Sequence, residues 1–234
     1  VLEQHLALCA EAPDDLTVWA VLRKAPPLPF LPEAWHGKEV IVLALLYAGD
    51  AADGERATEA VRAIGSPVGQ HLGAMPLTAF QAAFDPLLTP GARNYWKSHN
   101  FNEVGSEAID AILEYAARLP SDESEIFLAQ MGGETSRVPK DDTAYLHRDV
   151  AYILNVHTRW QASADDERCI DWARAFFQAT APFATGGVYI NFMPEDEVDR
   201  VETTHGENYG KLQAVKARYD PSNAFRVNQN IRPT

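Results

Sequence analysis

The sequence predicts an α+β protein with one large antiparallel sheet, helices packed on one face of that sheet, and the other face forming the roof of a cleft. Two strand–helix–strand passages follow one another early in the chain, a pattern typical of such a sheet. With 234 residues, 46% hydrophobic content and five Trp, the chain can bury one sizeable core. The longest apolar run, residues 40–48, has the length of a buried strand and is too short to span a membrane.

In the first half of the chain, Pro and Gly mark where the elements end. Pro13 ends the first helix, and the prolines between residues 26 and 32 lack the N–H that a sheet ladder needs. Gly65-Ser66-Pro67 ends the second helix. The elements predicted here are helices over 2–12, 52–64 and 80–88, strands over 16–22, 39–47 and 69–75, and an edge strand over 91–101.

The second half contains three helices and three strands. Ser106 is a suitable N-cap for the fourth predicted helix, and Asp165 or Asp166 for the fifth. Asp220 ends the last helix, because a residue before Pro is pushed out of the helical region. The elements predicted here are helices over 106–119, 166–177 and 208–219 and strands over 125–131, 147–156 and 186–191.

Composition argues against several partners and activities. A formal net charge of −13 repels phosphate backbones and acidic membranes, so we expect neither nucleic acid nor membrane as a partner. No Gly-rich loop follows a strand and opens a helix, and no Ser, His and acid form a recognisable nucleophile arrangement. The seven His are scattered without ligand spacing, which predicts no metal site. A self-contained enzyme is therefore poorly supported.

The two cysteines predict packing rather than chemistry. Cys9 and Cys169 each lie in an amphipathic helical pattern and are expected to be buried core thiols. Reduced thiols favour a cytoplasmic location.

The last fifth of the chain carries a family resemblance. Tyr189-x-Asn191-Phe192, then a helix, then Asp220-Pro221-x-Asn223-x-Phe225 and an Asn-rich tail, resembles the C-terminal end of FAD-linked oxidases of the berberine-bridge type. Before residue 125 the resemblance rests mainly on Tyr95-Trp96-Lys97. Between these stretches, the residues similar in order and spacing to the substrate domain of those oxidases are Gln130-Met131-Gly132-Gly133, His147-Arg148, Trp160 and Asp171-Trp172-Ala173-Arg174.

The resemblance implies a flavoenzyme that takes a hydride from an alcohol, sugar or heterocyclic small molecule and passes the electrons to oxygen. Residues 1–192 would be its substrate-binding domain, and residues 193–234 its C-terminal helix and tail. FAD would be held mainly by the protein's own N-terminal domain, preceding Val1, so this fragment alone is expected to be inactive. The alternative is a stand-alone, non-catalytic α+β ligand-binding or regulatory domain, and a structural interaction domain is compatible with either.

The resemblance also implies roles for single residues. Asn191 and Asn228 would contact the cofactor, although Asn191 could instead be a buried amide bonded to local backbone and Asn228 a turn residue. Tyr189 and Tyr152 would face the cleft, with core packing as the alternative for each. The remaining expected substrate-binding residues are Lys97, Gln130 and Leu154, and Leu154 stands where some relatives place a carboxylate, which favours a hydrophobic substrate.

Phe192 departs from the family pattern. Several members carry a Tyr there that takes the substrate hydroxyl proton, and Phe has no ionisable group for this step. The proton would then pass to the missing domain or to Tyr189, or the substrate needs no base. We expect the strand to end at Asn191 and Met193-Pro194 to turn the chain, so that Asn191 and Phe192 both reach the cleft. Phe225 is expected to anchor the tail by burial.

Overall fold

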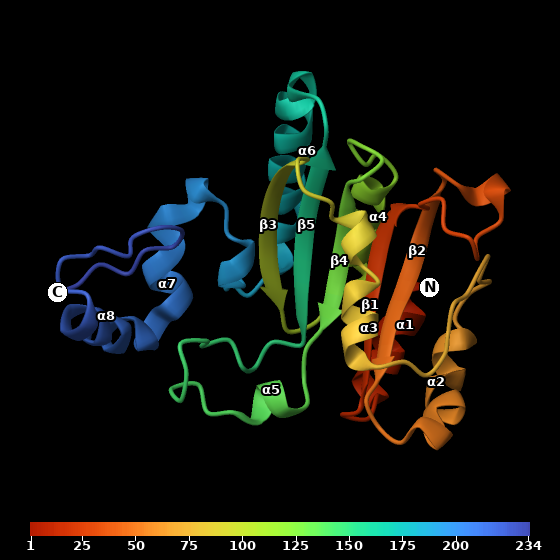
Figure 1. The fold of residues 1–234 in the computed structure, drawn as a ribbon, viewed down its shortest axis with the longest axis horizontal. Helices are drawn as coiled ribbons and strands as arrows, with labels where there is room; N and C mark the ends of the chain where they lie inside the picture. The colour runs from red at the N-terminus through yellow and green to blue at the C-terminus, as the bar shows by residue number, and fades with distance from the viewer.

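The computed structural model describes residues 1–234 and contains one five-stranded sheet in which all neighbouring strands are antiparallel. The strand order is β2-β1-β4-β5-β3, so β2 and β3 form the two edges (Figure 1). The predicted α+β class is confirmed. The strands span Leu16–Lys24 (β1), Glu39–Tyr47 (β2), Arg93–Phe101 (β3), Glu125–Gln130 (β4) and Tyr152–Trp160 (β5).

Helices cover one face of this sheet. Contacts run from α1 to β1, from α4 to β4 and from α6 to both β3 and β5, and Figure 1 shows these helices behind the strands. Helix α3 crosses in front of the sheet in that view, and none of its residues is buried. The helices span Leu2–Glu11 (α1), Gly54–Arg62 (α2), Leu77–Ala82 (α3), Ser106–Ala116 (α4), Glu134–Arg137 (α5), Asp166–Thr180 (α6), Val201–His205 (α7) and Tyr209–Tyr219 (α8).

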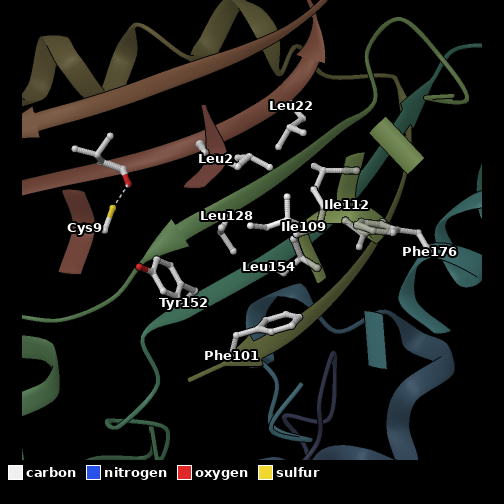
Figure 2. Close-up of a cluster of buried hydrophobic side chains, with 14 of the residues drawn as sticks. Leu2, Cys9, Leu22, Phe101, Ile109, Ile112, Leu128, Tyr152, Leu154 and Phe176 are labelled. Carbon is white, nitrogen blue, oxygen red and sulfur yellow. Dashed lines mark hydrogen bonds between the residues drawn. The ribbon is translucent and has the colours of Figure 1, made fainter. Parts of the chain in front are cut away.

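The main core lies between the sheet and the helices. Every second residue of β1 points into it, from Leu16 to Leu22, because side chains alternate between the faces of a strand. Leu154 of β5 is completely buried there, as is Phe176 of α6. Figure 2 shows strand and helix side chains meeting in this core: Leu22, Phe101, Ile109, Ile112, Leu128, Tyr152, Leu154 and Phe176.

Both cysteines are buried free thiols, as predicted. Burial raises the pKa of Cys9 to about 12, so this thiol stays protonated at neutral pH. Its Sγ lies 3.7 Å from the Val18 carbonyl oxygen, inside the core (Figure 2). Cys9 therefore packs and does not react.

Several predicted elements differ from those in the structure. Residues 69–75 form no strand: no strand of the sheet pairs with them, and residues 70–75 are exposed. The strand predicted over 147–156 begins five residues later, at Tyr152, since residues 146–150 turn before it and Arg148 N–H donates to Leu146 O. Residues 186–191 form no strand either. Ser106 begins α4 without capping it through its side chain, and Gly105 is the N-cap.

The C-terminal residues lie beside the edge strand β3, away from the main core (Figure 1). A small apolar cluster of Val188, Met193 and Val201 holds this part together. Asp220 ends α8 and accepts hydrogen bonds from the backbone N–H groups of Ala224 and Phe225. The expectation that Phe225 anchors the tail is wrong, because its side chain is 82% exposed and only its backbone is held. None of the helices has the length and apolar character needed to cross a membrane.

Candidate functional site

The sheet face opposite the main core, called the open face below, carries a hollow of about 510 Å³. Its floor comes from β1, β4 and β5, and its walls come from the 131–148 connection and residues 188–192. Because side chains alternate along each strand, the open face takes the residues that the core does not. Those used below are Trp19 on β1, Phe127 on β4, Asn155 and His157 on β5, and Trp96 and Ser98 on β3.

Aromatic rings line much of this site. Trp19 stacks on Phe127, with ring centroids 5.6 Å apart and planes within 1°. Phe192 stacks on Trp96 at 5.5 Å and meets Phe127 edge-on at 5.6 Å. Trp96 is backed in turn by His157, whose ring lies 3.7 Å from it and whose Nε2 lies 2.9 Å from Asn94 Oδ1. The hollow therefore offers flat apolar surfaces that are already fixed in place.

Phe192 lies on the open face and lines the hollow, as expected. The backbone reaches it differently from the expected strand end, since Ile190–Phe192 is a single 3₁₀ turn. In such a turn, neighbouring side chains do not alternate between two faces. Asn191 and Phe192 can therefore line the same hollow.

Tyr189 and Asn191 form a polar pair at this site. Asn191 Nδ2 donates to the Tyr189 hydroxyl at 2.9 Å, and Asn191 is exposed. The alternative of a buried amide bonded to local backbone is thus excluded for Asn191. Both side chains line the hollow, and Asn191 Oδ1 has no protein partner.

Gly187 allows the segment that carries this pair to lie close to the sheet. Its carbonyl accepts from Asn100 N–H of β3 at 3.2 Å. A Cβ at this position would lie 2.7 Å from Cε1 of His147 and 2.9 Å from Nδ2 of Asn100. No side chain fits there without movement of one of these neighbours.

Four residues expected to bind substrate lie elsewhere. Tyr152 and Leu154 point into the main core, because they share a face of β5 with Val156, and the expectation that they line the cleft is wrong (Figure 2). Gln130 joins two elements by accepting from Val18 N–H at 3.0 Å and donating to Cys9 O at 3.2 Å. Lys97 is on the helix-covered side of β3, in a buried ion pair with Glu197 at 2.5 Å.

Asn228 does not line the hollow and lies in an exposed turn of the tail. Its φ is 58°, in the left-handed region that Asn tolerates, and its carbonyl accepts from Asn230 N–H at 3.0 Å. Within this chain Asn228 is a turn residue, and its contact with a cofactor stays a prediction.

Sequence reasoning missed Asn155. Its side chain is completely buried on the open face, and neither amide atom has a protein partner. Ser98 stands opposite Asn155 on β3, equally buried, with its hydroxyl also unpartnered. Buried polar atoms without partners are rare in proteins. The signal in the sequence was a polar residue at every second position from Asn155 to Arg159, but with the strand placed too early it was not read as one face.

Tyr145 and His147 contribute polar groups to the lining of the hollow. Burial raises the pKa of Tyr145, and its hydroxyl has no protein partner. Burial lowers the pKa of His147, so its ring is neutral at neutral pH, and Nε2 is unpartnered. Both side chains come from the 131–148 connection. Of the two, only His147 is among the residues that carry the family resemblance. The hollow thus combines fixed aromatic surfaces with a few free hydrogen-bonding groups, as small-molecule sites do.

Comparison with known proteins shows which family this chain is similar to. Residues 188–232 match the family described as Berberine and berberine like. An uncharacterized FAD-linked oxidoreductase of Bacillus subtilis is 29% identical over 175 residues, which cover 72% of this chain and 38% of the relative. A chitooligosaccharide oxidase of Gibberella zeae is 36% identical over 112 residues, which cover 44% of this chain and 23% of the relative.

Solved structures share the fold along the whole chain. BBE-like 1 of Physcomitrella patens has a TM-score of 0.78 at 16% identity, covering 100% of this chain and 50% of that one. Berberine bridge enzyme from Eschscholzia californica has a TM-score of 0.76 at 19% identity, covering 100% and 52%. The chain spans about half the length of these proteins and less than half of the curated relatives named above. The family match itself covers residues 188–232, and the chain as a whole is similar to the C-terminal half of FAD-linked oxidoreductases of the berberine-bridge-like family.

Proposed function

We propose that this chain is the substrate-binding half of an FAD-dependent oxidoreductase, with its open face covering the flavin ring and a small-molecule substrate. The observation that carries the proposal is the hollow on the open face, which Tyr189, Asn191 and Phe192 of the family segment line together with the rings of Trp19 and Phe127. The named relatives are FAD-linked oxidoreductases or oxidases, which supports the reaction class.

The residues of the hollow fit a flavin ring and do not fit the whole nucleotide. An exposed amide such as Asn191 offers both a donor and an acceptor, which suits the alternating edge of a pyrimidine-like ring. The chain has no Gly-rich loop opening a helix that could cradle a pyrophosphate. FAD would supply the hydride acceptor here, and the N-terminal half of the protein would hold its phosphates.

The lining favours a hydrophobic, ring-bearing substrate over a free sugar. Trp19, Phe127 and Phe192 supply flat apolar walls, while Tyr145 and His147 supply single hydrogen-bonding groups. A sugar needs a partner for each of several hydroxyls, and the aromatic walls provide none. Leu154, from which a hydrophobic substrate was expected, lies in the main core and does not contribute to this preference.

Phe192 cannot take the substrate proton, so another group must. Tyr189 lies beside it, with ring centroids 5.0 Å apart, and lines the same hollow. The Tyr189 oxygen accepts a hydrogen bond from Asn191, which fixes the orientation of that hydroxyl group. Tyr189 is thus our candidate for the proton acceptor within this chain.

The cofactor assignment is tested by colour. The 234-residue chain purified alone should be colourless and without oxidase activity, because it holds no phosphate-cradling loop. The full-length protein should be yellow, and Asn191→Ala in it should weaken flavin retention or slow flavin reduction by about tenfold, from loss of one hydrogen bond to the edge of the flavin ring. A stoichiometric flavin in the isolated chain would contradict the proposal that the N-terminal half of the protein holds the FAD phosphates. A colourless full-length protein that still binds ligands in the hollow would favour the non-catalytic alternative.

A hydroxyl restored at position 192 tests the proton step. Phe192→Tyr should leave the fold intact, because the ring edge faces a hollow. In the full-length enzyme it should change the pH dependence of flavin reduction, since a phenol then lies beside the substrate. Phe183→Tyr is the matched control, a half-buried ring packed against the main core. An unchanged pH profile in Phe192→Tyr, with the fold intact, would show that position 192 does not face the reacting group.

A further inference from the structure

The C-terminal segment holds both faces of the edge strand β3 within a few residues. Trp96 and Lys97 are consecutive, so their side chains point to opposite faces of the sheet. Phe192 stacks on Trp96 on the open face. Five positions later, Glu197 pairs with Lys97 on the helix-covered side. Residues 193–196 therefore pass around the outer edge of β3 between two fixed points.

The contact on the helix-covered side is a buried ionic cluster. The Lys97 and Glu197 side chains are 8% and 6% exposed, and Nζ lies 2.5 Å from Oε1. The second carboxylate oxygen of Glu197 accepts from Arg200 at 3.0 Å. Lys97 Nζ also lies 4.8 Å from the centre of the Phe177 ring of α6. Strand, helix and C-terminal segment thus meet at one charge pair.

A second, more exposed set of contacts also joins the C-terminal segment to β3 and α6. Asp196 accepts from the Tyr95 hydroxyl of β3 at 2.7 Å and from Arg174 of α6 at 2.8 Å. Its nearer oxygen is 3.8 Å from Lys97 Nζ. Glu195–Arg200 is a run of 3₁₀ turns in which Glu197 departs from helical φ and ψ. Helical hydrogen bonds alone therefore do not hold this run in place.

A buried ion pair specifies position better than it adds stability. Removing two charges from water costs about as much as their attraction returns, so apolar side chains of similar size would contribute about as much to stability. The pair differs from such side chains because each partner has one acceptable location, whereas apolar groups can slide. The segment fixed in this way is the one that carries Tyr189, Asn191 and Phe192.

We propose that Lys97 and Glu197 are positioning residues, which clamp residues 193–197 around the edge of β3 and so fix the Tyr189–Phe192 turn over the hollow. The effect on substrate or flavin rests on the proposed function, whereas the effect on the turn does not. Lys97 would act on the site indirectly, from the face opposite the one on which sequence reasoning placed it.

Hydrogen exchange of the chain tests the clamp directly. Glu197→Gln and Lys97→Met should each speed exchange of the 189–193 amides by at least about tenfold, while the β1 and β4 amides keep wild-type protection. Arg118→Gln, which breaks the exposed Arg118–Glu114 pair, is the control and should change neither region. Equal acceleration in the turn and the sheet would overturn the proposal, because the pair would then act only on global stability.

Two further variants keep the test valid if an unpaired charge prevents folding. Lys97→Met combined with Glu197→Leu removes both charges and keeps the bulk, so the sheet should be as stable as in the wild type and the turn still faster in exchange. The charge swap, Lys97→Glu with Glu197→Lys, should restore slow exchange of the turn at least in part. Wild-type exchange of the turn in the apolar pair would overturn the proposal.

The full-length protein separates this inference from the proposed function. There the apolar pair should raise KM for substrate by about tenfold or more, with flavin content unchanged and kcat affected less, because binding groups are displaced and not removed. Faster exchange of the turn in a protein with no oxidase activity would refute the proposed function and support the clamp. Unchanged exchange of the turn in an apolar-pair variant that is an active oxidase would refute the clamp and support the proposed function.

Discussion

Substitutions at two neighbouring residues of β5 should change stability in opposite directions. Leu154→Asn should lower the free energy of unfolding by about 3–5 kcal/mol, because it removes a fully buried apolar side chain and leaves an amide in the core. Asn155→Leu should raise it by about 1–3 kcal/mol, because it removes two buried amide atoms that have no partner. Urea denaturation of both variants beside the wild type measures the difference.

The same pair of variants separates structure from function. In the full-length enzyme, Asn155→Leu should weaken substrate binding by about tenfold or more while the protein becomes more stable, a combination typical of binding residues kept at a cost to stability. Thr158→Val is a control on the core side of β5: it removes a hydroxyl that is bonded to the Tyr95 carbonyl and should be mildly destabilising. If Asn155→Leu destabilises as strongly as Leu154→Asn, the two faces of β5 have been assigned wrongly.

The family motif and the sheet could be predicted because both depend on local signals. Apolar runs with Pro and Gly boundaries gave four of the five strands to within a few residues, and Asp220-Pro221 gave the end of α8. The faces of β5 could not be predicted in this way. Alternation shows that Leu154 and Asn155 lie on opposite sides, but only the packing of α4 and α6 decides which side is the core.

Other errors arose from contacts between distant parts of the chain. Lys97 looked like a cleft residue because its partner Glu197 is 100 positions away. Residues 186–191 were predicted as a strand because Val188, Tyr189 and Ile190 are β-branched or aromatic, and propensity is a weak guide where tertiary contacts decide. Phe225 was expected to be buried on hydrophobicity alone, although no part of this chain packs on its side chain.

Acid should destabilise the fold through His99, a side chain outside the proposed site. His99 is 4% exposed on the helix-covered side of β3 and stacks on Phe177 with ring centroids 3.9 Å apart. Its Nε2 donates to the Phe177 carbonyl at 2.9 Å, while Nδ1 is buried without a partner. The pKa of His99 is lowered to about 4, mainly by burial. The hydrogen bond to Phe177 and the charge of Glu197 oppose this shift, and the charges of Arg200 and Lys97 add to it.

The direction of the pH effect follows from the number of protons that His99 binds in the folded and the unfolded chain. Between the folded pKa of about 4 and the ordinary value of 6.5, the unfolded chain binds a proton at His99 that the folded chain does not. Stability therefore falls as the pH drops from 6.5 to 4, by a total on the order of 3 kcal/mol from this residue. Burial lowers the pKa of His5 and His147 too, so they add to the same acid sensitivity, and a single-site variant is needed to separate His99.

His99→Gln keeps a donor for the Phe177 carbonyl but cannot gain a charge, so it should flatten the dependence of unfolding free energy on pH across this window. Denaturation midpoints measured at pH 7, 6, 5 and about 4 give the slope for each variant. The exposed His71, replaced in the same way, should leave the slope unchanged. Equal slopes in wild type and His99→Gln would mean that the folded protein admits a proton, and therefore water, at Nδ1. In that case the packing of α6 on β3 must be looser than the stacking of Phe177 on His99 indicates.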